Sequence, residues 1–312
     1  MLRRLFKISI VMLLTIFCSQ NFIYSSIVTD NVTFLETGDA SITYYDTLQE
    51  HPPAEVDINK LRDLSILQKN YYAVDKKTGM KEDMFNIDNL MNENVHINME
   101  GNGPKILIFH THGSEMYADS ENINQGVIGA GEYLKQLLED KYGIECMHYT
   151  QRFDVVNGSI QRDGAYERAE PVISQIIAEN PSIQLVIDLH RDGVNENLRL
   201  VSNVDGEQCA KVMFFNGLCR KWTNGRLTDL TSLPNPYLRT NLALSLKMQM
   251  KMNELYPNLT RKIYLNAYRY SLHMKDKSML IELGAQTNTV KEVNNSVEKL
   301  AETLFEVVAM QN

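Results

Sequence analysis

Short apolar runs alternate with stretches of helical periodicity over residues 101–312. Residues 105–109 (KILIF) and 184–189 (QLVIDL) predict buried strands, because both runs are short and follow turn-forming residues. Further strands are expected at residues 144–149, 198–203, 211–216 and 278–283, and helices at residues 126–142, 163–179, 241–256 and 289–310. Within the second helix, Pro171 predicts a kink or a restart. This alternation predicts an α/β fold with a mostly parallel central sheet flanked by helices.

The first 100 residues have a different pattern. Residues 1–28 begin with basic residues and continue into an apolar run at residues 8–18, which is shorter than the ~20 residues of a full span. No clean small-residue cleavage site follows, which favours a retained signal anchor over a cleaved signal peptide. Either one places the rest of the chain outside the cytoplasm, and the retained anchor that we expect would hold it at the cell membrane. Residues 29–100 are polar and irregular and predict a stalk or an N-terminal elaboration, which leaves residues 101–312 as the catalytic domain.

Composition and charge exclude several classes of protein. Hydrophobic residues make up 44% of the chain and charged residues 22%, as in folded globular proteins and unlike disordered ones. The formal net charge is −8, and such an acidic chain lacks the basic surface that a nucleic-acid partner requires. The four cysteines are too few and too scattered for a disulfide framework or a cysteine-ligated zinc site. We expect them to be small buried apolar side chains.

Three of the predicted strands lead to histidine and glutamate side chains. One runs into the segment HTHGSE (residues 110–115), the second into His190, and the last carries Glu282 near its end. The carboxyl ends of parallel strands meet at one edge of a sheet, so these side chains are expected to lie together. Two imidazoles and a carboxylate are the ligands of a catalytic zinc. We therefore expect His112, Glu115 and His190 to bind Zn²⁺, with Glu282 as the general base and acid.

Other polar residues near these strand ends each have two interpretations. We expect His110 to orient a ligand or to be a satisfied structural histidine, and not to bind the metal directly. Asp188 shares a strand face with His190, and it either orients this histidine or pairs with a basic group in the core. Arg191 either steadies an oxyanion or a peptide carboxylate of the substrate, or forms an ordinary ion pair. His148 lies inside a predicted strand and is expected to be structural.

Several motifs of the chain resemble those of one protein family. They are ILIFHTHGSE, the Asp154…Tyr166-Glu-Arg168 segment, DLHRDG, PYLRTNLALSLKMQ, YSLHM and LIELGAQTNT. Together they make the region from Pro104 to the C-terminus similar to the stage II sporulation protein P family. Members of that family are membrane-anchored N-acetylmuramoyl-L-alanine amidases of endospore-forming bacteria. The short N-terminal anchor and the variable segment after it also resemble the family.

The resemblance implies a zinc-amidase α/β sandwich, like that of cell-wall amidases, with the metal ligands named above. It leaves the glutamate ligand open, because many cell-wall amidases take theirs from the helix after the first strand. In this chain that region offers Glu121 or Glu132. We retain Glu115, because its spacing from His112 resembles the HxxE motif of zinc carboxypeptidases.

The resemblance also implies a reaction and partners. The reaction is hydrolysis of the amide between N-acetylmuramic acid and L-alanine in peptidoglycan, during spore engulfment and septal wall remodelling. Two alternatives stay open: a stem-peptide endopeptidase, because the same metal chemistry cuts any amide, and a non-catalytic module that binds glycan and recruits partners. The implied partners are stage II sporulation proteins D and M. Three positions resemble family positions near the cleft and are expected either to contact substrate or to serve capping and surface pairing: Arg239, Asn241 and His273.

Overall fold

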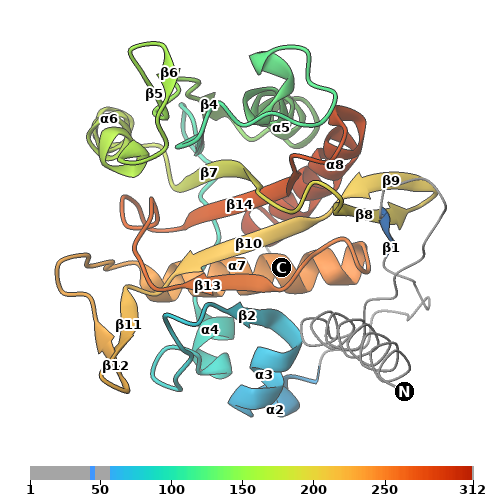
Figure 1. The fold of residues 1–312 in the computed structure, drawn as a ribbon. Helices are drawn as coiled ribbons and strands as arrows, with labels where there is room; N and C mark the ends of the chain where they lie inside the picture. The colour runs from blue at the N-terminus through green and yellow to red at the C-terminus, as the bar shows by residue number, and fades with distance from the viewer. Residues whose placement is uncertain (1–42, 46–56, 311–312) are drawn as a thin grey trace, which may run out of the picture.

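A computed structural model describes residues 43–45 and 57–310, and a seven-stranded sheet forms their centre (Figure 1). In order across the sheet, the strands are β2 (Tyr72–Val74), β13 (Ile263–Asn266), β10 (Val212–Gly217), β14 (Ser278–Ala285), β7 (Leu185–Asp192), β3 (Ile106–Phe109) and β4 (Cys146–His148). Neighbouring strands are parallel except β10 and β14, which are antiparallel. The mostly parallel α/β fold expected from the sequence is confirmed.

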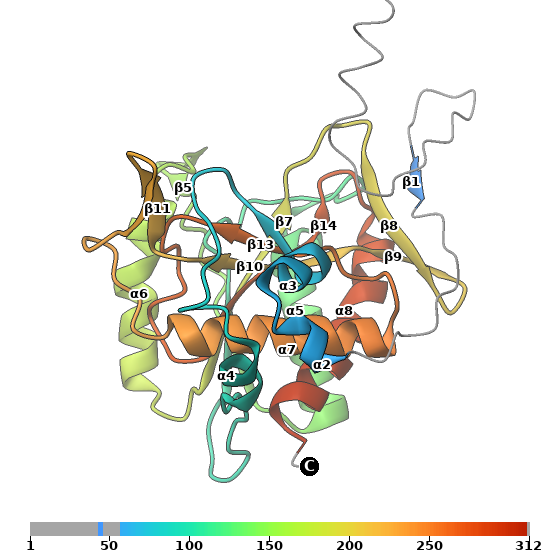
Figure 2. The ribbon, with the colours of Figure 1, turned by 90° about the horizontal axis from the view of Figure 1, so that it is seen from below.

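Helices cover both faces of this sheet, because successive residues of a strand point to opposite faces. The four longest helices of the described residues are α5 (Val127–Tyr142), α6 (Ala165–Glu179), α7 (Leu238–Leu255) and α8 (Val290–Val308). On β3, Ile106 and Ile108 pack into the core shared with α5, α7 and α8, whereas Leu107 and Phe109 pack on α6. In Figure 2, α6 lies on the left of the view, α5 and α8 lie to its right, and α7 runs between the two sides.

The helix ends reflect local sequence signals. α5 ends at Gly143, whose φ of 67° is a left-handed conformation that glycine adopts without steric cost. α8 begins after Thr289, which forms a reciprocal capping box with Glu292. Of the kink or restart expected at Pro171, the restart is absent, because α6 is one continuous helix through this residue. The proline removes one helical hydrogen bond, but the buried face of α6, which includes Ala169, continues across it.

Residues 57–100 belong to the same core as the rest of the described chain. They contain α2 (Ile58–Leu61), α3 (Leu64–Tyr71), β2 and α4 (Ile87–Asn92). β2 extends the sheet beside β13, and Leu67 and Leu90 are buried in the main core. We expected neither strand, because each is too short to show a clear alternation of polar and apolar residues. The predicted anchor at residues 1–28 lies outside the described residues.

Smaller elements complete the described part of the chain. They are the three-stranded sheet of β1 (Thr43–Tyr45), β8 (Arg199–Val204) and β9 (Glu207–Ala210), the hairpins β5 (Val155–Val156) with β6 (Ser159–Ile160) and β11 (Arg220–Thr223) with β12 (Arg226–Asp229), and the 3₁₀ helix η1 (Ile123–Gln125). Cys146, Cys209 and Cys219 are buried free thiols, as expected. Within residues 43–45 and 57–310, no helix has the length and apolarity needed to cross a membrane.

Candidate metal centre

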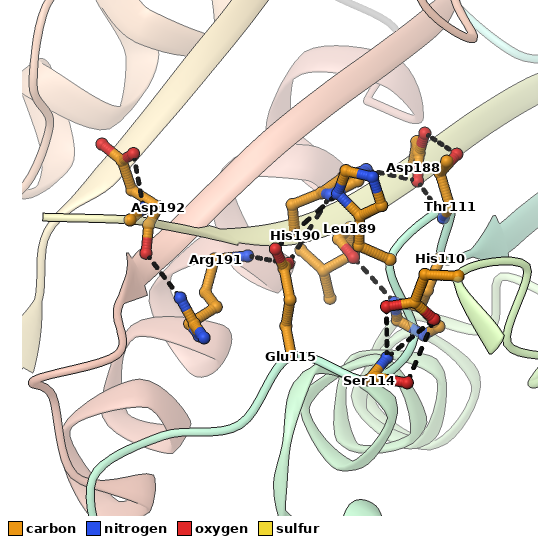
Figure 3. A network of polar contacts seen from close by, with 12 residues as sticks. His110, Thr111, Ser114, Glu115, Asp188, Leu189, His190, Arg191 and Asp192 are labelled. Carbon is orange, nitrogen blue, oxygen red and sulfur yellow. Dashed lines mark hydrogen bonds and ion pairs between the residues drawn. The ribbon is translucent and has the colours of Figure 1, made fainter. Parts of the chain in front are cut away.

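Two histidines and a glutamate meet where β3 and β7 end. His112 and Glu115 lie in the loop after β3, where a hydrogen bond of 3.2 Å from the Glu115 N–H to the His112 carbonyl closes a turn. His190 lies within β7, and its side chain points toward Glu115 (Figure 3). Nδ1 of His112 lies 3.7 Å from Oε1 of Glu115, and Nδ1 of His190 lies 3.6 Å from Oε2. One ligand atom from each residue lies within 4.8 Å of the others, so the predicted ligand group does come together.

Two buried carboxylates hold the loop after β3 in place. Asp188 on β7 accepts hydrogen bonds from the backbone N–H of Thr111 at 2.8 Å and from its hydroxyl at 2.7 Å. Asp154 accepts hydrogen bonds from the backbone N–H of Ser114 at 3.2 Å and from its hydroxyl at 3.1 Å. The residues on both sides of His112 are therefore fixed, which positions its imidazole.

Asp188 also orients His190. The two residues alternate along β7, so their side chains share one face of the strand. Oδ1 of Asp188 lies 2.8 Å from Nε2 of His190, which leaves Nδ1 directed at Glu115. Burial would raise the pKa of Asp188, but the charge of His190 and the hydrogen bonds from Thr111 lower it to about 2. Burial would lower the pKa of His190, but Asp188 and Glu115 raise it well above its ordinary value.

The donor set and its spacing fit a zinc ion. Zinc is held tetrahedrally by histidine nitrogen and carboxylate oxygen at about 2.0–2.2 Å, which sets neighbouring donors about 3.3 Å apart. The nitrogen–oxygen distances of 3.6 and 3.7 Å in this cluster are near that spacing and too long for hydrogen bonds. Burial, and then the charge of His190, lower the pKa of His112, which favours the neutral imidazole that metal binding requires. With three protein ligands, a fourth position stays open for water or substrate.

Neither alternative glutamate ligand lies in this cluster. Glu121 is exposed, and its backbone N–H donates a hydrogen bond to the side chain of Gln125. Glu132 on α5 lies 2.8 Å from Nδ1 of His148. Among the described residues, Glu115 is the carboxylate that joins the two histidines.

Glu282 lies beside the cluster on the neighbouring strand, β14. In the sheet it is paired in register with His190 of β7. Its Oε2 is buried and has no hydrogen-bond partner among the described residues. Burial raises the pKa of Glu282 to about 8, and Glu115 and Asp192 add to this effect while His190 opposes it. An unpaired buried carboxyl oxygen costs stability, which indicates a functional and not a packing role.

His110 follows β3 and links it to β7 by a side-chain hydrogen bond, and its ring nitrogens contact groups outside the cluster of His112, Glu115 and His190. Its Nδ1 lies 2.7 Å from the carbonyl oxygen of Leu189, and its Nε2 lies 2.8 Å from Nε2 of His148. Burial, and then the neighbouring His148, lower the pKa of His110 to about 3, so this imidazole stays neutral. The contacts are those of an orienting or structural histidine.

Comparison with known proteins identifies the family. A family model described as stage II sporulation protein P matches residues 20–305. The chain belongs to the stage II sporulation protein P family. The resemblance carried by the motifs is thereby confirmed. Stage II sporulation protein P of Bacillus subtilis (strain 168) is 21% identical over 227 residues, which are 66% of this chain and 52% of the relative. The chain thus spans about half the length of that curated member of the family.

Two solved amidase structures show a partial likeness. The N-acetylmuramoyl-L-alanine amidase from Clostridium difficile 630 matches 66% of this chain and 95% of its own, at 13% identity and a TM-score of 0.38. The CwlD amidase from Clostridioides difficile, solved in complex with the GerS lipoprotein, matches 64% of this chain and 94% of its own, at 14% identity and a TM-score of 0.40. The assignment to the stage II sporulation protein P family rests on the sequence match alone.

Two of the expected substrate-contacting residues are engaged within the fold. The guanidinium of Arg191 donates hydrogen bonds to the backbone carbonyls of Met116, at 2.7 Å, and Asp192, at 3.0 Å. Its backbone N–H donates to Oε2 of Glu115 at 3.0 Å, so this residue helps to fix the glutamate. Asn241 is fully buried in α7, with both ends of its amide hydrogen-bonded to backbone groups. The contacts of Arg191 therefore position Glu115, and those of Asn241 join α7 to the start of β14.

The other two expected residues pair with carboxylates outside the cluster. Arg239 has a side chain that is 69% exposed and lies 2.7 Å from Glu93. Nε2 of His273 lies 3.0 Å from Glu170 on α6. Within the described residues, neither of them belongs to the candidate metal-binding group of His112, Glu115 and His190.

Two residues that sequence reasoning did not single out as site residues lie beside the candidate metal centre. The ring of Tyr166 packs edge-on against His112 at 5.5 Å between centroids and lies nearly parallel to His190 at 6.3 Å. Nη1 of Arg162 lies 3.4 Å from Oε1 of Glu115. Tyr166 belongs to a motif that carries the family resemblance, and this membership could have marked it as a site residue. Arg162 lies in a polar loop without periodicity, and nothing in the sequence marks it as a site residue.

Proposed function

We propose that this chain is a zinc-dependent N-acetylmuramoyl-L-alanine amidase that hydrolyses peptidoglycan during sporulation. The supporting observation is the open cluster of His112, Glu115 and His190 next to Glu282, which has an unpaired, buried carboxyl oxygen. This combination of ligands and a neighbouring carboxyl is the one that metal-assisted amide hydrolysis uses. Membership of the stage II sporulation protein P family supports the biological setting.

In this proposal, three residues hold the metal and one moves the proton. His112, Glu115 and His190 would be the ligands, and Asp188 keeps His190 in the orientation that binding needs. When bound, zinc supplies Lewis-acid polarisation of the carbonyl and lowers the pKa of water from about 15.7 to about 7. Glu282, whose ionised form the positive charge of a bound zinc ion would favour, would accept a proton from the attacking water as the water oxygen bonds to the carbonyl carbon. It then returns the proton to the leaving nitrogen as the carbon–nitrogen bond breaks.

A defined muramyl peptide distinguishes this activity from its two rivals. We expect the zinc-loaded protein to release a peptide with a free N-terminal L-alanine and to leave the muramic acid with a new carboxylate. Cleavage inside the peptide would instead identify a stem-peptide endopeptidase. Binding of glycan without any cleavage would identify a non-catalytic recruitment module. The Glu282→Gln variant, purified in parallel, controls for contaminating hydrolases.

We also propose that residues 1–28 anchor the chain in the cell membrane, with the catalytic domain on the extracytoplasmic side. The basic residues followed by an apolar run support this orientation. Fractionation should recover the full-length chain in the membrane, with later residues accessible to external protease. A shortened soluble form that starts near Ile27 would identify a cleaved signal peptide instead. Stage II sporulation proteins D and M are the proposed partners, and co-purification from sporulating cells tests them.

A further inference from the structure

An arginine reaches the candidate metal centre from a loop outside the sheet. Arg162 lies between β6 and α6, and its Nη1 is 3.4 Å from Oε1 of Glu115, the oxygen that also faces His112. The side chain of Arg162 is 49% exposed, whereas that of Glu115 is 3% exposed. Arg162 therefore lies at the boundary between the buried cluster and solvent.

The loop that carries Arg162 is fixed by a second arginine. The guanidinium of Arg168 donates hydrogen bonds to the backbone carbonyls of Phe153, Gln161 and Asp163, at 2.7, 2.6 and 3.0 Å. These three contacts hold both ends of the loop against the start of α6. Donors that are fixed before the reaction stabilise developing charge most effectively, because they need no reorganisation during it.

The proposed reaction places a negative charge next to several carboxyl groups. As the oxygen of water bonds to the carbonyl carbon, the π electron pair of the carbonyl moves to its oxygen, which becomes negative. Glu115 within the cluster and Asp188 beside it are negatively charged and oppose this charge, whereas Glu282 has by then accepted the water proton. The positive guanidinium of Arg162, at the boundary with solvent, offsets this negative charge. A guanidinium has five N–H donors, and the contact with Glu115 leaves others free to bind the oxyanion.

We propose that Arg162 is a catalytic residue that donates a hydrogen bond to the oxyanion formed on the scissile carbonyl. This inference rests on the proposed amidase function and adds the side chain that stabilises its transition state. Arg191, for which the sequence left open a contact to the oxyanion or to a substrate carboxylate and an ordinary ion pair, has its guanidinium directed at two backbone carbonyls. The competing explanation is that Arg162 only compensates the charge of buried Glu115. That explanation predicts loss of metal when the arginine is replaced.

Kinetics of Arg162→Gln and Arg162→Lys, measured on full-length zinc-loaded protein, test the proposal. The interaction forms only in the transition state, so kcat of Arg162→Gln should fall by roughly 10²–10³ while KM changes little. Arg162→Lys keeps the charge without the planar fork and should lose less. The zinc content of both variants should equal that of the wild type. Arg62→Gln is the matched control, because Arg62 is 56% exposed and also pairs with a carboxylate, that of Asp88.

A tetrahedral analogue gives a readout that needs no turnover. A muramyl peptide with a phosphonamidate in place of the scissile amide carries a negative oxygen where the oxyanion would form. Its affinity, measured by calorimetry, should fall in Arg162→Gln by about the same factor as kcat. The affinity for the uncleaved amide, measured in the Glu282→Gln background, should not change when Arg162 is also replaced.

Three results would overturn the role of Arg162. They are an unchanged kcat in Arg162→Gln, a rise in KM without a loss of kcat, and a loss of zinc. The second would assign the arginine to a carboxylate of the bound substrate, and the third to compensation of Glu115. If the wild type cleaves no muramyl amide, the amidase proposal fails together with this one. If the wild type and Arg162→Gln cleave equally well, only the role of the arginine fails.

Discussion

Two side-chain groups of the same composition lie next to each other at the end of β3. Each contains two histidines and a glutamate: His112, His190 and Glu115 in the open group, and His110, His148 and Glu132 in the closed group. In the closed group, successive partners are 2.7–2.8 Å apart, including the contact with a backbone carbonyl of β7. In the open group, the two Nδ1 atoms stand 3.7 and 3.6 Å from the carboxylate oxygens.

This difference in distance distinguishes a group held by its own hydrogen bonds from a group that could hold a metal ion. Partners at hydrogen-bond distance satisfy each other, and nothing fits between them. A spacing of 3.6–3.7 Å leaves polar atoms facing one another with room for an ion, because two bonds to zinc span about 3.3 Å. Composition cannot make this distinction, and neither can proximity along the chain, since His110 and His112 are separated by a single residue.

Ligand substitutions should separate the two groups most clearly. Glu115→Ala and His190→Ala should lose zinc and amidase activity together, while the sheet remains folded because its apolar core is untouched. Glu132→Ala is the matched control and should keep both, because its carboxylate belongs to the closed group. Metal analysis beside circular dichroism gives the result. Full zinc occupancy in Glu115→Ala, with loss in Glu132→Ala or Glu121→Ala, would exchange the roles of the glutamates.

Next to the open group, the Glu282→Gln substitution should impair proton transfer and leave metal binding intact. The amide keeps the shape of the side chain and leaves all three ligands in place, so zinc and substrate should still bind. Turnover should fall by roughly 10²–10⁴, the usual contribution of a positioned proton-transfer group, and the loss should appear in kcat. Steady-state kinetics and zinc content are measured on one sample. A variant that lacks zinc would make Glu282 a ligand, and one with wild-type kcat would remove it from the mechanism.

Removal of the metal should lower the free energy of unfolding only in variants whose open group is intact. An ion present at 1,000 times its Kd stabilises the folded state by about 4.1 kcal/mol, if it does not bind the unfolded chain. Denaturant unfolding with and without a chelator should show a difference of this order in the wild type. The difference should vanish in His190→Ala and persist in Glu132→Ala. A wild type that is insensitive to the chelator would mean that the open group holds no ion under those conditions.

The sequence predicted the parts of this site that depend on local spacing. The three-residue step from His112 to Glu115 and the two-residue step from Asp188 to His190 each place two side chains on one side of a turn or strand. The meeting of these pairs follows from parallel strands ending at one edge of the sheet.

Features that depend on long-range register or side-chain direction were not predictable. The contact of His110 with the Leu189 carbonyl requires the pairing of β3 with β7. The guanidinium of Arg191 donates to backbone carbonyls, and the sequence left a substrate contact and an ordinary ion pair equally open for this residue. Arg162 reaches the cluster from a loop whose conformation is fixed by Arg168, and no periodicity marks such a contact.

The smallest effect is expected in the closed group. His110 donates its Nδ1 proton to the Leu189 carbonyl and stays neutral, so its Nε2 accepts a hydrogen bond from His148. His148→Ala leaves this buried acceptor unpaired, which should lower the free energy of unfolding by about 1–3 kcal/mol. His148→Gln offers an amide N–H near the position of Nε2 and should lose less.

Denaturant unfolding of the two His148 variants measures these losses, and zinc analysis and kcat of the same samples should match the wild type. The reason is that the ligands are held independently, His190 by Asp188 and the loop around His112 by Asp188 and Asp154. Loss of zinc in His148→Gln would contradict this independence. In that case the closed group would position the ligands of the open group, through the link that His110 makes between β3 and β7.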